Sequence, residues 1–428
     1  MQFLIRAAHI TDAHSAVDGQ VCDLLIDNGL IRQIGQKLSV QADIDVIEGE
    51  NLHLSAGWVD MRVSGMDPGF EHKEDITSVC RAAAAGGFTD IALLPNTQPV
   101  IDSKDTLGYV RRMAQGQPVS IHPIAAVTKK TAGADFAEML DLHYAGAVAF
   151  SDGHLPLQNP DLLLKTLQYL QPIGGLLMNR PEEAMLTRFG QMHEGVQSTL
   201  LGLKGIPALA EELSIERDLR LLEYVGVAQT ESYLPALHFS TISTARSVEL
   251  IRQAKARGMA VSCDVAAHQL IFDDSALSGF DTNFKVNPPF RSPDDVTALW
   301  AGLADGTIDA IVSDHLPQDS ESKQIEFDHA EFGIIGLETA VAAVLTHNRG
   351  LSLNQLVDRL TTRPRHIFRL PAVTIAEGQP ARLTLFDPTG SWTYQQTHSK
   401  SRNSPFLGQQ LTGRVIGTVH QGQFIANS

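Results

Sequence analysis

Polar side chains that could carry out chemistry follow short apolar runs in the middle of the chain. The first run has the apolar residues Trp58, Val59, Met61 and Val63, and it brings Arg62 and Ser64 to a Gly-Met-Asp-Pro-Gly turn that begins at Gly65. Side chains alternate along a β-strand, so Arg62 and Ser64 point the same way. A guanidinium does not deprotonate to become a metal ligand, and a serine hydroxyl is a poor one. The pair therefore predicts charge pairing and hydrogen bonding instead of metal binding.

Two carboxylates follow later runs. Asp314 comes at the end of the eighth run, where a carboxylate can act as a general base. The alternative, which we favour in the absence of other ligands, is an N-cap or an ion-pair partner for Arg62 or Arg180. Asp152 precedes Gly153 at the end of the fourth run, where it could bridge metal ions or serve as a loop aspartate.

Neutral polar groups occupy other run ends. Asn96 follows the second run and could bind a substrate amide, or fix the backbone of its own turn. His238, His268 and His315 lie at the ends of the sixth, seventh and eighth runs. A single histidine at a strand end is usually satisfied by hydrogen bonds, so these residues alone do not predict a metal site.

The runs alternate with helical segments such as residues 74–85 and 243–257, where apolar residues recur at helical spacing. The runs are residues 56–62, 90–95, 119–127, 147–151, 175–178, 234–239, 260–265 and 308–313. Eight strand–helix units predict an α/β fold, a TIM (β/α)8 barrel with its site at the carboxyl ends of the strands. A doubly wound open sheet is the alternative. Two long insertions, residues 182–233 and 268–308, are expected to shape the mouth or an interface.

Both ends of the chain have the alternating texture of β-strands, with turn signals such as Asp27-Asn28-Gly29. We expect residues 1–55 and 365–428 to form a small composite β-sandwich domain and residues 56–364 to form the barrel. The two β segments are expected to pair with each other beside the barrel.

Composition limits the possible partners and location. The net charge of −16 and the pI near 5.4 argue against binding to nucleic acid or to an anionic membrane. No stretch approaches the roughly 18 apolar residues that span a bilayer. Cys22, Cys80 and Cys263 are odd in number and widely spaced, which predicts neither disulfides nor a thiolate metal site. A cytoplasmic location fits.

Nine motifs together closely resemble bacterial dihydroorotases of the amidohydrolase superfamily. They include Asn-Pro-Pro-Phe-Arg at residues 287–291 and Ser-Lys-Ser-Arg-Asn-Ser-Pro-Phe at residues 399–406. The motifs span residues 67–75, 81–89, 95–97, 192–195, 202–207, 283–291, 314–317, 336–339 and 399–406. The resemblance covers essentially the whole chain.

The resemblance implies a TIM barrel that hydrolyses the cyclic amide of dihydroorotate at a zinc site. That family holds its metal with His-x-His on strand one, an Asp or carboxylated Lys on strand four, histidines on strands five and six, and an Asp on strand eight. The matching positions here are Arg62, Ser64, Asp152, Asn179 or Arg180, Thr241 and Asp314. The metal histidines are thus absent, while the vestigial carboxylates Asp152 and Asp314 remain. Of the implied substrate contacts, Asn96 is retained, whereas the family arginine is Met66 and the carboxylate-binding histidine is Gln318.

A zinc hydrolase needs about three or four ligands to hold the ion and activate its water, so two carboxylates are too few. We expect no zinc, and we expect Arg62 to neutralise Asp152 or Asp314. The sequence therefore predicts an inactive dihydroorotase-like protein of pyrimidine biosynthesis. By resemblance it would be a homodimer and a structural partner of aspartate carbamoyltransferase. The alternative is an active amidohydrolase whose single metal is held by Asp152, Asp314 and one of His238, His268 or His315.

Overall fold

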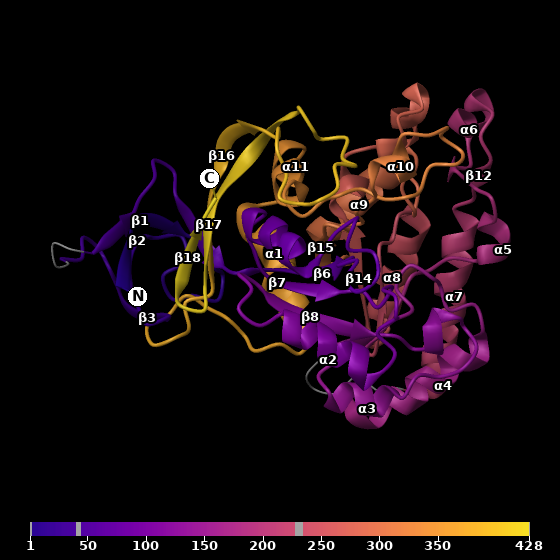
Figure 1. Cartoon of the computed structure of the whole chain (residues 1–428), viewed down its shortest axis with the longest axis horizontal. Coiled ribbons are helices and arrows are strands. Elements are labelled where there is room, and N and C mark those ends of the chain that lie inside the picture. The colour runs from indigo at the N-terminus through magenta and orange to yellow at the C-terminus, as the bar shows by residue number, and fades with distance from the viewer. Residues whose placement is uncertain (1, 40–43, 227–233, 428) are drawn as a thin grey trace.

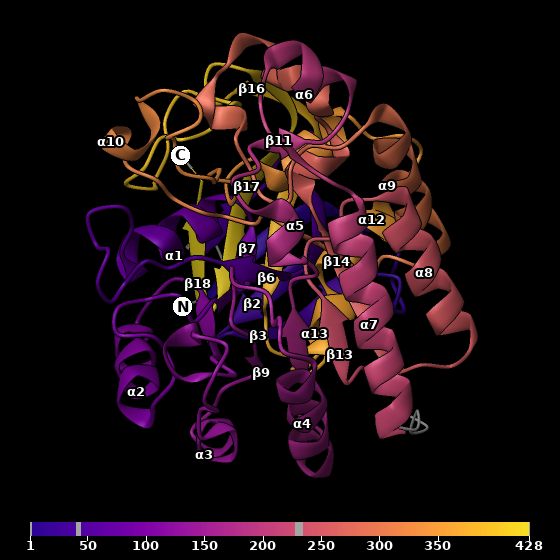
Figure 2. The same cartoon turned by 90° about the vertical axis from the view of Figure 1, so that its right-hand side faces the viewer.

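The computed structural model describes residues 2–39, 44–226 and 234–427. Eight parallel strands, neighbours in the order of the chain, form the barrel (Figures 1 and 2), and a bridge from Val63 to His315 joins its first and last strand ends. The strands are β6 (Trp58–Val63), β7 (Phe88–Leu93), β8 (Ser120–Ala125), β9 (Ala149–Phe150), β10 (Leu177–Asn179), β13 (Leu237–Phe239), β14 (Val261–Ala266) and β15 (Ala310–Val312). Each predicted run overlaps one of these strands, with ends that differ by a few residues at most, so the TIM-barrel prediction is confirmed and the open sheet is not observed.

Helices surround the barrel (Figure 2), and several begin at the side-chain caps that their sequences indicate. Asp75 and Ser292 form capping boxes at the starts of α1 and α9, because each accepts a hydrogen bond from a backbone amide of the first turn. The larger helices are α1 (Ile76–Ala85), α2 (Lys104–Met113), α3 (Met139–Tyr144), α4 (Pro160–Leu170), α7 (Leu209–Val225), α8 (Ala245–Ala256), α9 (Pro293–Asp305), α11 (Ala340–Thr346), α12 (Leu353–Leu360) and α13 (Thr362–Ile367).

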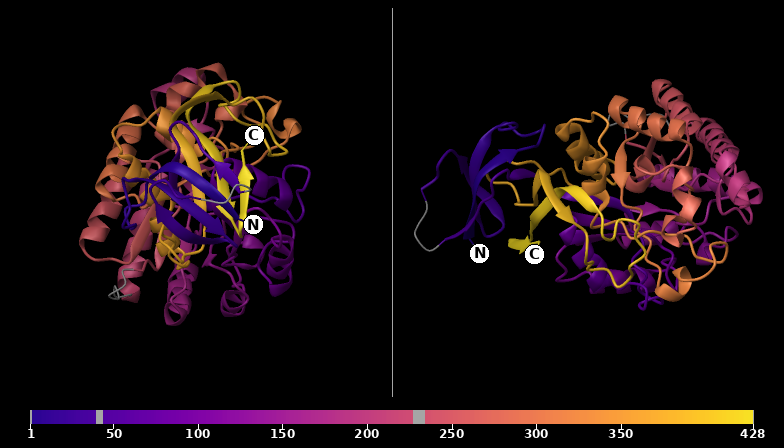
Figure 3. Two further views of the ribbon diagram at one scale, coloured as in Figure 1. Left: turned by 90° about the vertical axis from the view of Figure 1, so that its left-hand side faces the viewer. Right: turned by 90° about the horizontal axis from the view of Figure 1, so that it is seen from above.

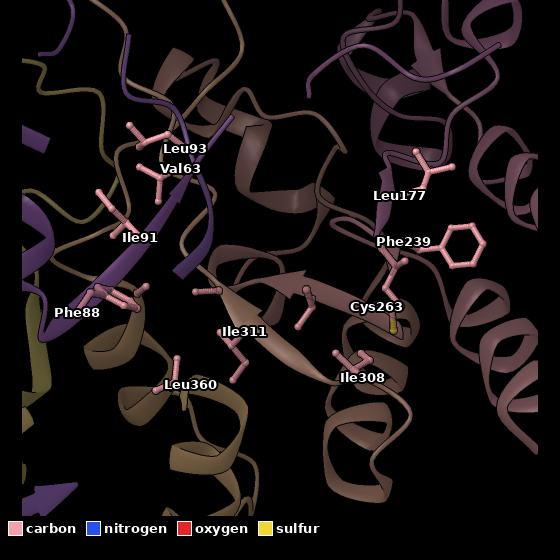
Figure 4. Packing of buried hydrophobic residues seen from close by; sticks show 14 of the residues in the cluster. Val63, Phe88, Ile91, Leu93, Leu177, Phe239, Cys263, Ile308, Ile311 and Leu360 are labelled. Atoms are coloured by element: carbon pink, nitrogen blue, oxygen red, sulfur yellow. The ribbon is translucent and has the colours of Figure 1, made fainter. Parts of the chain in front are cut away.

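Two apolar layers fix the strands. Met61, Ile124 and Met178 belong to a cluster that fills the barrel interior together with Ile367 and Phe368 from the C-terminal part of the chain. A larger cluster, which includes Phe88 and Phe239, lies between the strands and the helices (Figure 4). Because seven of the eight strands are buried on both faces, and β8 is half-buried only in its first three residues, the strands appear as apolar runs in the sequence.

The chain ends pair in a second sheet, at the left of Figure 1 and set apart from the barrel in Figure 3. It consists of β1 (Gln2–Ile10), β2 (Val21–Asp27), β3 (Leu30–Gly35), β4 (Asp45–Ile47), β5 (His53–Ala56), β16 (Leu383–Thr393), β17 (Gln410–His420) and β18 (Gln423–Ala426). Antiparallel pairing of β5 with β16 joins the two ends, as expected. The division at residues 55 and 365 stays a prediction.

One buried carboxylate links the two sheets. Asp90, on β7, accepts hydrogen bonds from Arg365 at 2.6 Å and from Arg382 at 2.9 Å, and His122 lies 2.8 Å away. Burial alone would raise the pKa of Asp90, but the hydrogen bond from His122 and the two guanidiniums hold it well below its ordinary value. The carboxylate therefore stays charged and fixes the small sheet against the barrel.

Both long insertions contain helices and short turns, and residues 227–233 of the first lie outside the described residues. The first contains α5 (Ala184–Thr187), β11 (Met192–His193), α6 (Val196–Leu201), β12 (Gly205–Ile206) and α7. The second contains three short 3-10 turns, at Ala267–Leu270, Asp274–Gly279 and Thr282–Phe284, before α9, and α10 (Ser320–Lys323) follows β15. Met192 and Phe290 pack in one apolar cluster that joins the insertions. Among the described residues, no helix is long and apolar enough to cross a membrane.

Candidate functional site

An ion pair between the first and last barrel strands lies at the centre of the predicted site. Arg62 Nε donates to Asp314 Oδ1 at 2.8 Å, and the Arg62 side chain is 1% exposed. Asp314 has a φ of 48°, a left-handed conformation that is costly for a residue with a side chain. The expected ion pair of Arg62 is therefore present, and its partner is Asp314.

A second buried carboxylate positions this pair. Asp60, two residues before Arg62 on β6, accepts from the backbone amides of Arg62 at 3.0 Å and Ser313 at 3.1 Å. Burial raises the pKa of Asp60 to about 7. Asp60 therefore ties the ends of β6 and β15 together directly beside the ion pair.

His154 lies between the two residues that stand at the family's His-x-His positions. Its Nε2 is 2.9 Å from Ser64 Oγ, and its Nδ1 is 3.4 Å from Arg62 Nη2. Arg62 and Ser64 thus reach the same group, as strand alternation predicted. Burial, and then the charges of Arg62 and Arg180, hold the pKa of His154 well below its ordinary value. The imidazole is therefore neutral.

Arg180 closes the other side of His154. It follows β10, donates from Nη1 to the backbone carbonyl of His154 at 2.7 Å, and forms an ion pair with Glu182. Glu182 also accepts hydrogen bonds from Thr187 and Asn287, so its carboxylate is held by three side chains. Glu182 therefore compensates the charge of the second guanidinium. Arg62, Ser64, His154, Arg180 and Asp314 are here called the Arg62 cluster.

Asp152 is turned away from the Arg62 cluster by its hydrogen bonds. Its Oδ1 accepts from the amides of Val127 and Thr128, both at 3.0 Å, and its Oδ2 accepts from the hydroxyl of Thr128 at 2.5 Å. Burial raises the pKa of Asp152. Of the two carboxylates expected to neutralise Arg62, Asp314 is therefore the partner, whereas Asp152 fixes the loop after β8.

Asn96 holds the loop that carries His154. Its Nδ2 donates to the carbonyl of Asp152, and its Oδ1 accepts from the amide of His154, both at 3.0 Å. A Cβ on Gly153, which has a φ of 68°, would lie 1.7 Å from Asn96 Oδ1. Both functional atoms of Asn96 are therefore engaged with backbone, although in another loop and not in its own turn.

The residues at the ends of strands five and six are also fully occupied. Asn179 donates to Asp218 of α7 at 2.6 Å and accepts from the amide of Leu157. The amide of Thr241 donates to Asp264, 2.6 Å away. His238 lies 2.8 Å from both Ser262 Oγ and Asp264 Oδ2, so each of its ring nitrogens has a partner.

Two further histidines differ in their surroundings. His315 Nε2 is 3.3 Å from Glu74 Oε2, and its Nδ1 accepts from the amide of Gly336 at 3.2 Å. His268 is buried against Phe290, and its Nε2 has no hydrogen-bond partner among the described residues. Burial lowers the pKa of His268 to about 4, opposed by the charge of Asp314.

These side chains do not fit the zinc site that the resemblance implies. The oxygens of Asp152 are used by three donors, Asp314 is bound to a guanidinium, and both nitrogens of His238 are engaged. Across residues 2–39, 44–226 and 234–427, His, Cys, Asp and Glu form no group of three or more able to hold a metal ion. A tetrahedral zinc site needs ligands that are free of such competition.

Two residues of the site were not singled out from the sequence. His154 and Asp60 carry no motif of their own, although His154 stands two residues beyond Asp152 and Asp60 two residues before Arg62. The available signals were the position of His154 just after strand four and the position of Asp60 within strand one. Of the implied substrate contacts, Gln318 donates to the carbonyl of Phe332 at 2.9 Å and accepts from Lys73 at 2.6 Å, while Met66 is buried.

The fold is a TIM barrel with an attached sheet built from both chain ends. L-Hydantoinase from Arthrobacter aurescens has this fold, with a TM-score of 0.85 over 99% of this chain and 96% of that one at 24% identity. A D-hydantoinase matches with a TM-score of 0.84 at 22% identity, over 100% of this chain and 95% of its own.

In sequence, the chain is more similar to dihydroorotases than to these two hydantoinases. A family model described as Dihydro-orotase-like matches residues 53–236. A dihydroorotase of Geotalea daltonii is 40% identical and one of Citrifermentans bemidjiense 41% identical, each over 99% of both chains. The chain belongs to the dihydroorotase family of the amidohydrolase superfamily.

Proposed function

We propose that this chain acts in cytoplasmic pyrimidine biosynthesis without hydrolysing dihydroorotate, as a structural partner of aspartate carbamoyltransferase. The observation that carries the proposal is the Arg62 cluster. Four positions where the family resemblance places metal histidines hold Arg62, Ser64, Asn179 and Thr241, and each makes hydrogen bonds within the chain. The sequence similarity nevertheless extends over 99% of the length of two relatives that are named dihydroorotase.

The chemistry of the cluster supports loss of hydrolysis. Activating water at neutral pH requires lowering its pKa from near 16 to about 7, which a coordinated zinc ion can do. A guanidinium is a permanent hydrogen-bond donor and cannot accept a proton from water. Asp314, the residue in the position of a general base, accepts a hydrogen bond from Arg62 Nε at 2.8 Å, so this oxygen is already engaged inside the chain.

A turnover assay with metal analysis tests the first half of the proposal. The protein is purified without chelator, its metal content is measured by elemental mass spectrometry, and the same sample is assayed with dihydroorotate. The Geotalea daltonii dihydroorotase, treated identically, is the positive control. We expect substoichiometric metal and no turnover. Near-stoichiometric zinc together with turnover would contradict the proposal.

Association with the transferase tests the second half. Aspartate carbamoyltransferase of the same organism is co-purified with this chain and the mixture is run in analytical ultracentrifugation. We expect a complex larger than either protein, and a dimer of this chain when it is alone. Separate sedimentation of the two proteins at micromolar concentrations would rule out the structural role while leaving the turnover result unaffected.

One observation favours a second candidate, a cyclic amide hydrolase with an altered site. His268 Nε2 is buried and has no hydrogen-bond partner among the described residues, and the charge of Asp314 opposes the lowering of the His268 pKa by burial. In this candidate a single metal is held by Asp152, Asp314 and one of His238, His268 or His315. This candidate predicts turnover of a cyclic amide that is lost in Asp314→Asn.

A further inference from the structure

Segments from four of the sequence motifs meet around one cavity. The cavity has a volume of about 410 Å³, and His72, Asn283, Gln318 and Arg402 each contribute to its lining from a different motif or the residue after it. Neither Arg62, His154, Arg180 nor Asp314 lines it. This volume lies within the usual range for small-molecule sites, so the four segments surround a space large enough for a ligand.

Hydrogen bonds between these segments hold the cavity wall in place. Asn403 donates from Nδ2 to the carbonyls of Leu316 and Gly333, both at 3.0 Å, and accepts from the amide of Gln318. Ser401 donates to the carbonyl of Lys73 at 2.8 Å. Both amide atoms of Gln318 are also used, which makes this residue part of the wall. The cavity is therefore formed before any ligand arrives.

The charges on the wall are unbalanced. Asp319 is the carboxylate of the lining, and it lies 3.4 Å from His72, while Lys400 is 2.5 Å from Asp75. Two cations remain: among the described residues, neither Lys323 nor Arg402 forms an ion pair. In a chain with a net charge of −16, a cavity lined by two cations outside any ion pair and by one carboxylate, Asp319, has an excess of positive charge.

Lys323 is the more informative of the two cations because it is buried. Its ammonium donates to the carbonyls of Thr282 at 2.8 Å and Glu331 at 2.7 Å, which leaves its third proton free for another acceptor. Burial, and then the neighbouring Lys285, lower the pKa of Lys323 to about 7, opposed by Asp281 and Glu331. A buried cation without a counter-ion is costly, and an anion in the cavity would lower that cost.

We propose that this cavity binds a small oxyanion-bearing metabolite, with Arg402 and Lys323 as its charged contacts. The ligand carries a phosphate or a pair of carboxylates, both of which the planar guanidinium of Arg402 can bind through two hydrogen bonds. The site is independent of dihydroorotate turnover and goes beyond the proposed structural function.

Isothermal titration calorimetry on the full chain tests the proposal, in a buffer without oxyanions. Inorganic phosphate, pyrophosphate and succinate are titrated separately, because the probe that binds distinguishes a phosphate from a dicarboxylate. We expect saturable one-site binding of at least one of them. Arg402→Gln, an exposed substitution that leaves the wall intact, is expected to weaken binding about tenfold.

Two variants complete the design. Arg402→Lys keeps the charge without the planar donor pair, and it should retain part of the affinity. Arg246→Gln removes a comparable exposed charge from α8, outside the cavity, and should bind as the unmodified protein does. Absence of saturable binding for all three anions at millimolar concentrations would overturn the proposal, as would equal affinity of Arg402→Gln and the unmodified protein.

Discussion

The guanidinium of Arg62 and the carboxylate of Asp314 meet at 2.8 Å across the closure of the barrel, 252 residues apart in the chain. They lie at the positions where the family resemblance places a zinc ligand on strand one and another on strand eight. An internal ion pair therefore joins the two strand ends that a shared metal would join. The two strand ends are thus joined directly by two side chains of the chain.

Removing one partner of this pair should be strongly destabilising. Arg62→Met keeps much of the volume but leaves Asp314 buried without its cation, which typically costs about 3–5 kcal/mol. Urea unfolding followed by circular dichroism measures the change. In Arg62→Met/Asp314→Asn the unpaired charge is gone, so the double variant should be more stable than the single one.

An exposed ion pair provides the control for this prediction. Arg32 lies 3.6 Å from Asp27 with a side chain that is 48% exposed. Arg32→Met should change the free energy of unfolding by less than about 1 kcal/mol. Equal effects of the substitutions at Arg32 and Arg62 would show that the buried pair contributes no more than a surface contact.

The contact between Gly153 and Asn96 should resist any larger residue. In Gly153→Ala the new Cβ would lie 1.7 Å from Asn96 Oδ1 on a backbone with a φ of 68°. We expect a loss of about 1–3 kcal/mol in the free energy of unfolding. Adding Asn96→Ala removes the clashing oxygen, so the double variant should lose less than the sum of the two single variants. Simple additivity would show that the loop does not depend on this contact.

Zinc should have no effect on the stability of the folded protein. A ligand that binds the native state stabilises it by RT ln(1 + [L]/Kd), or about 2.7 kcal/mol at a hundred times Kd. Because the side chains at the metal positions are engaged elsewhere, we expect the same thermal midpoint with zinc, with a chelator and with neither. The Geotalea daltonii relative serves as the comparison. A rise in the midpoint with micromolar zinc would show that the Arg62 cluster can open to bind metal.

The sequence was sufficient for the strands and for one contact of the site. The barrel strands are buried on both faces, apart from the half-buried start of β8, and so appear as apolar runs. Opposite charges at strand ends one and eight must lie close together in a closed barrel. The position of His154 could not be predicted in this way. Its loop takes its shape from Asn96, which is 58 residues away and bonds to the backbone and not to a side chain.

The same limit applies to Asn179. Its partner Asp218 lies on α7, within an insertion that the sequence indicated as a long loop. Side-chain pairing between a strand end and an inserted helix depends on where the helix packs, which local propensity does not determine. The residues at the positions where the family resemblance places metal histidines could therefore be read from the sequence, but the contacts that they make could not.

His154 should make the stability of the protein sensitive to mild acid. Its pKa in the folded state lies well below the ordinary value of 6.5, whereas the unfolded chain has the ordinary value. Below pH 6.5 the unfolded state therefore binds more protons than the folded state, so stability falls as the pH decreases from 6.5 toward the folded-state pKa. Above pH 6.5 both states are neutral and this contribution is constant.

The glutamine variant isolates this contribution. His154→Gln keeps a polar side chain near Ser64 but cannot titrate, so its free energy of unfolding should decrease less between pH 7 and pH 5 than that of the unmodified protein. Ser64→Ala removes a hydrogen bond and leaves the imidazole buried beside Arg62 and Arg180, so its pH dependence should persist. Urea unfolding at each pH gives the comparison. Parallel pH profiles for His154→Gln and the unmodified protein would mean that the imidazole accepts a proton without opening the cluster, for example by turning toward Asp314.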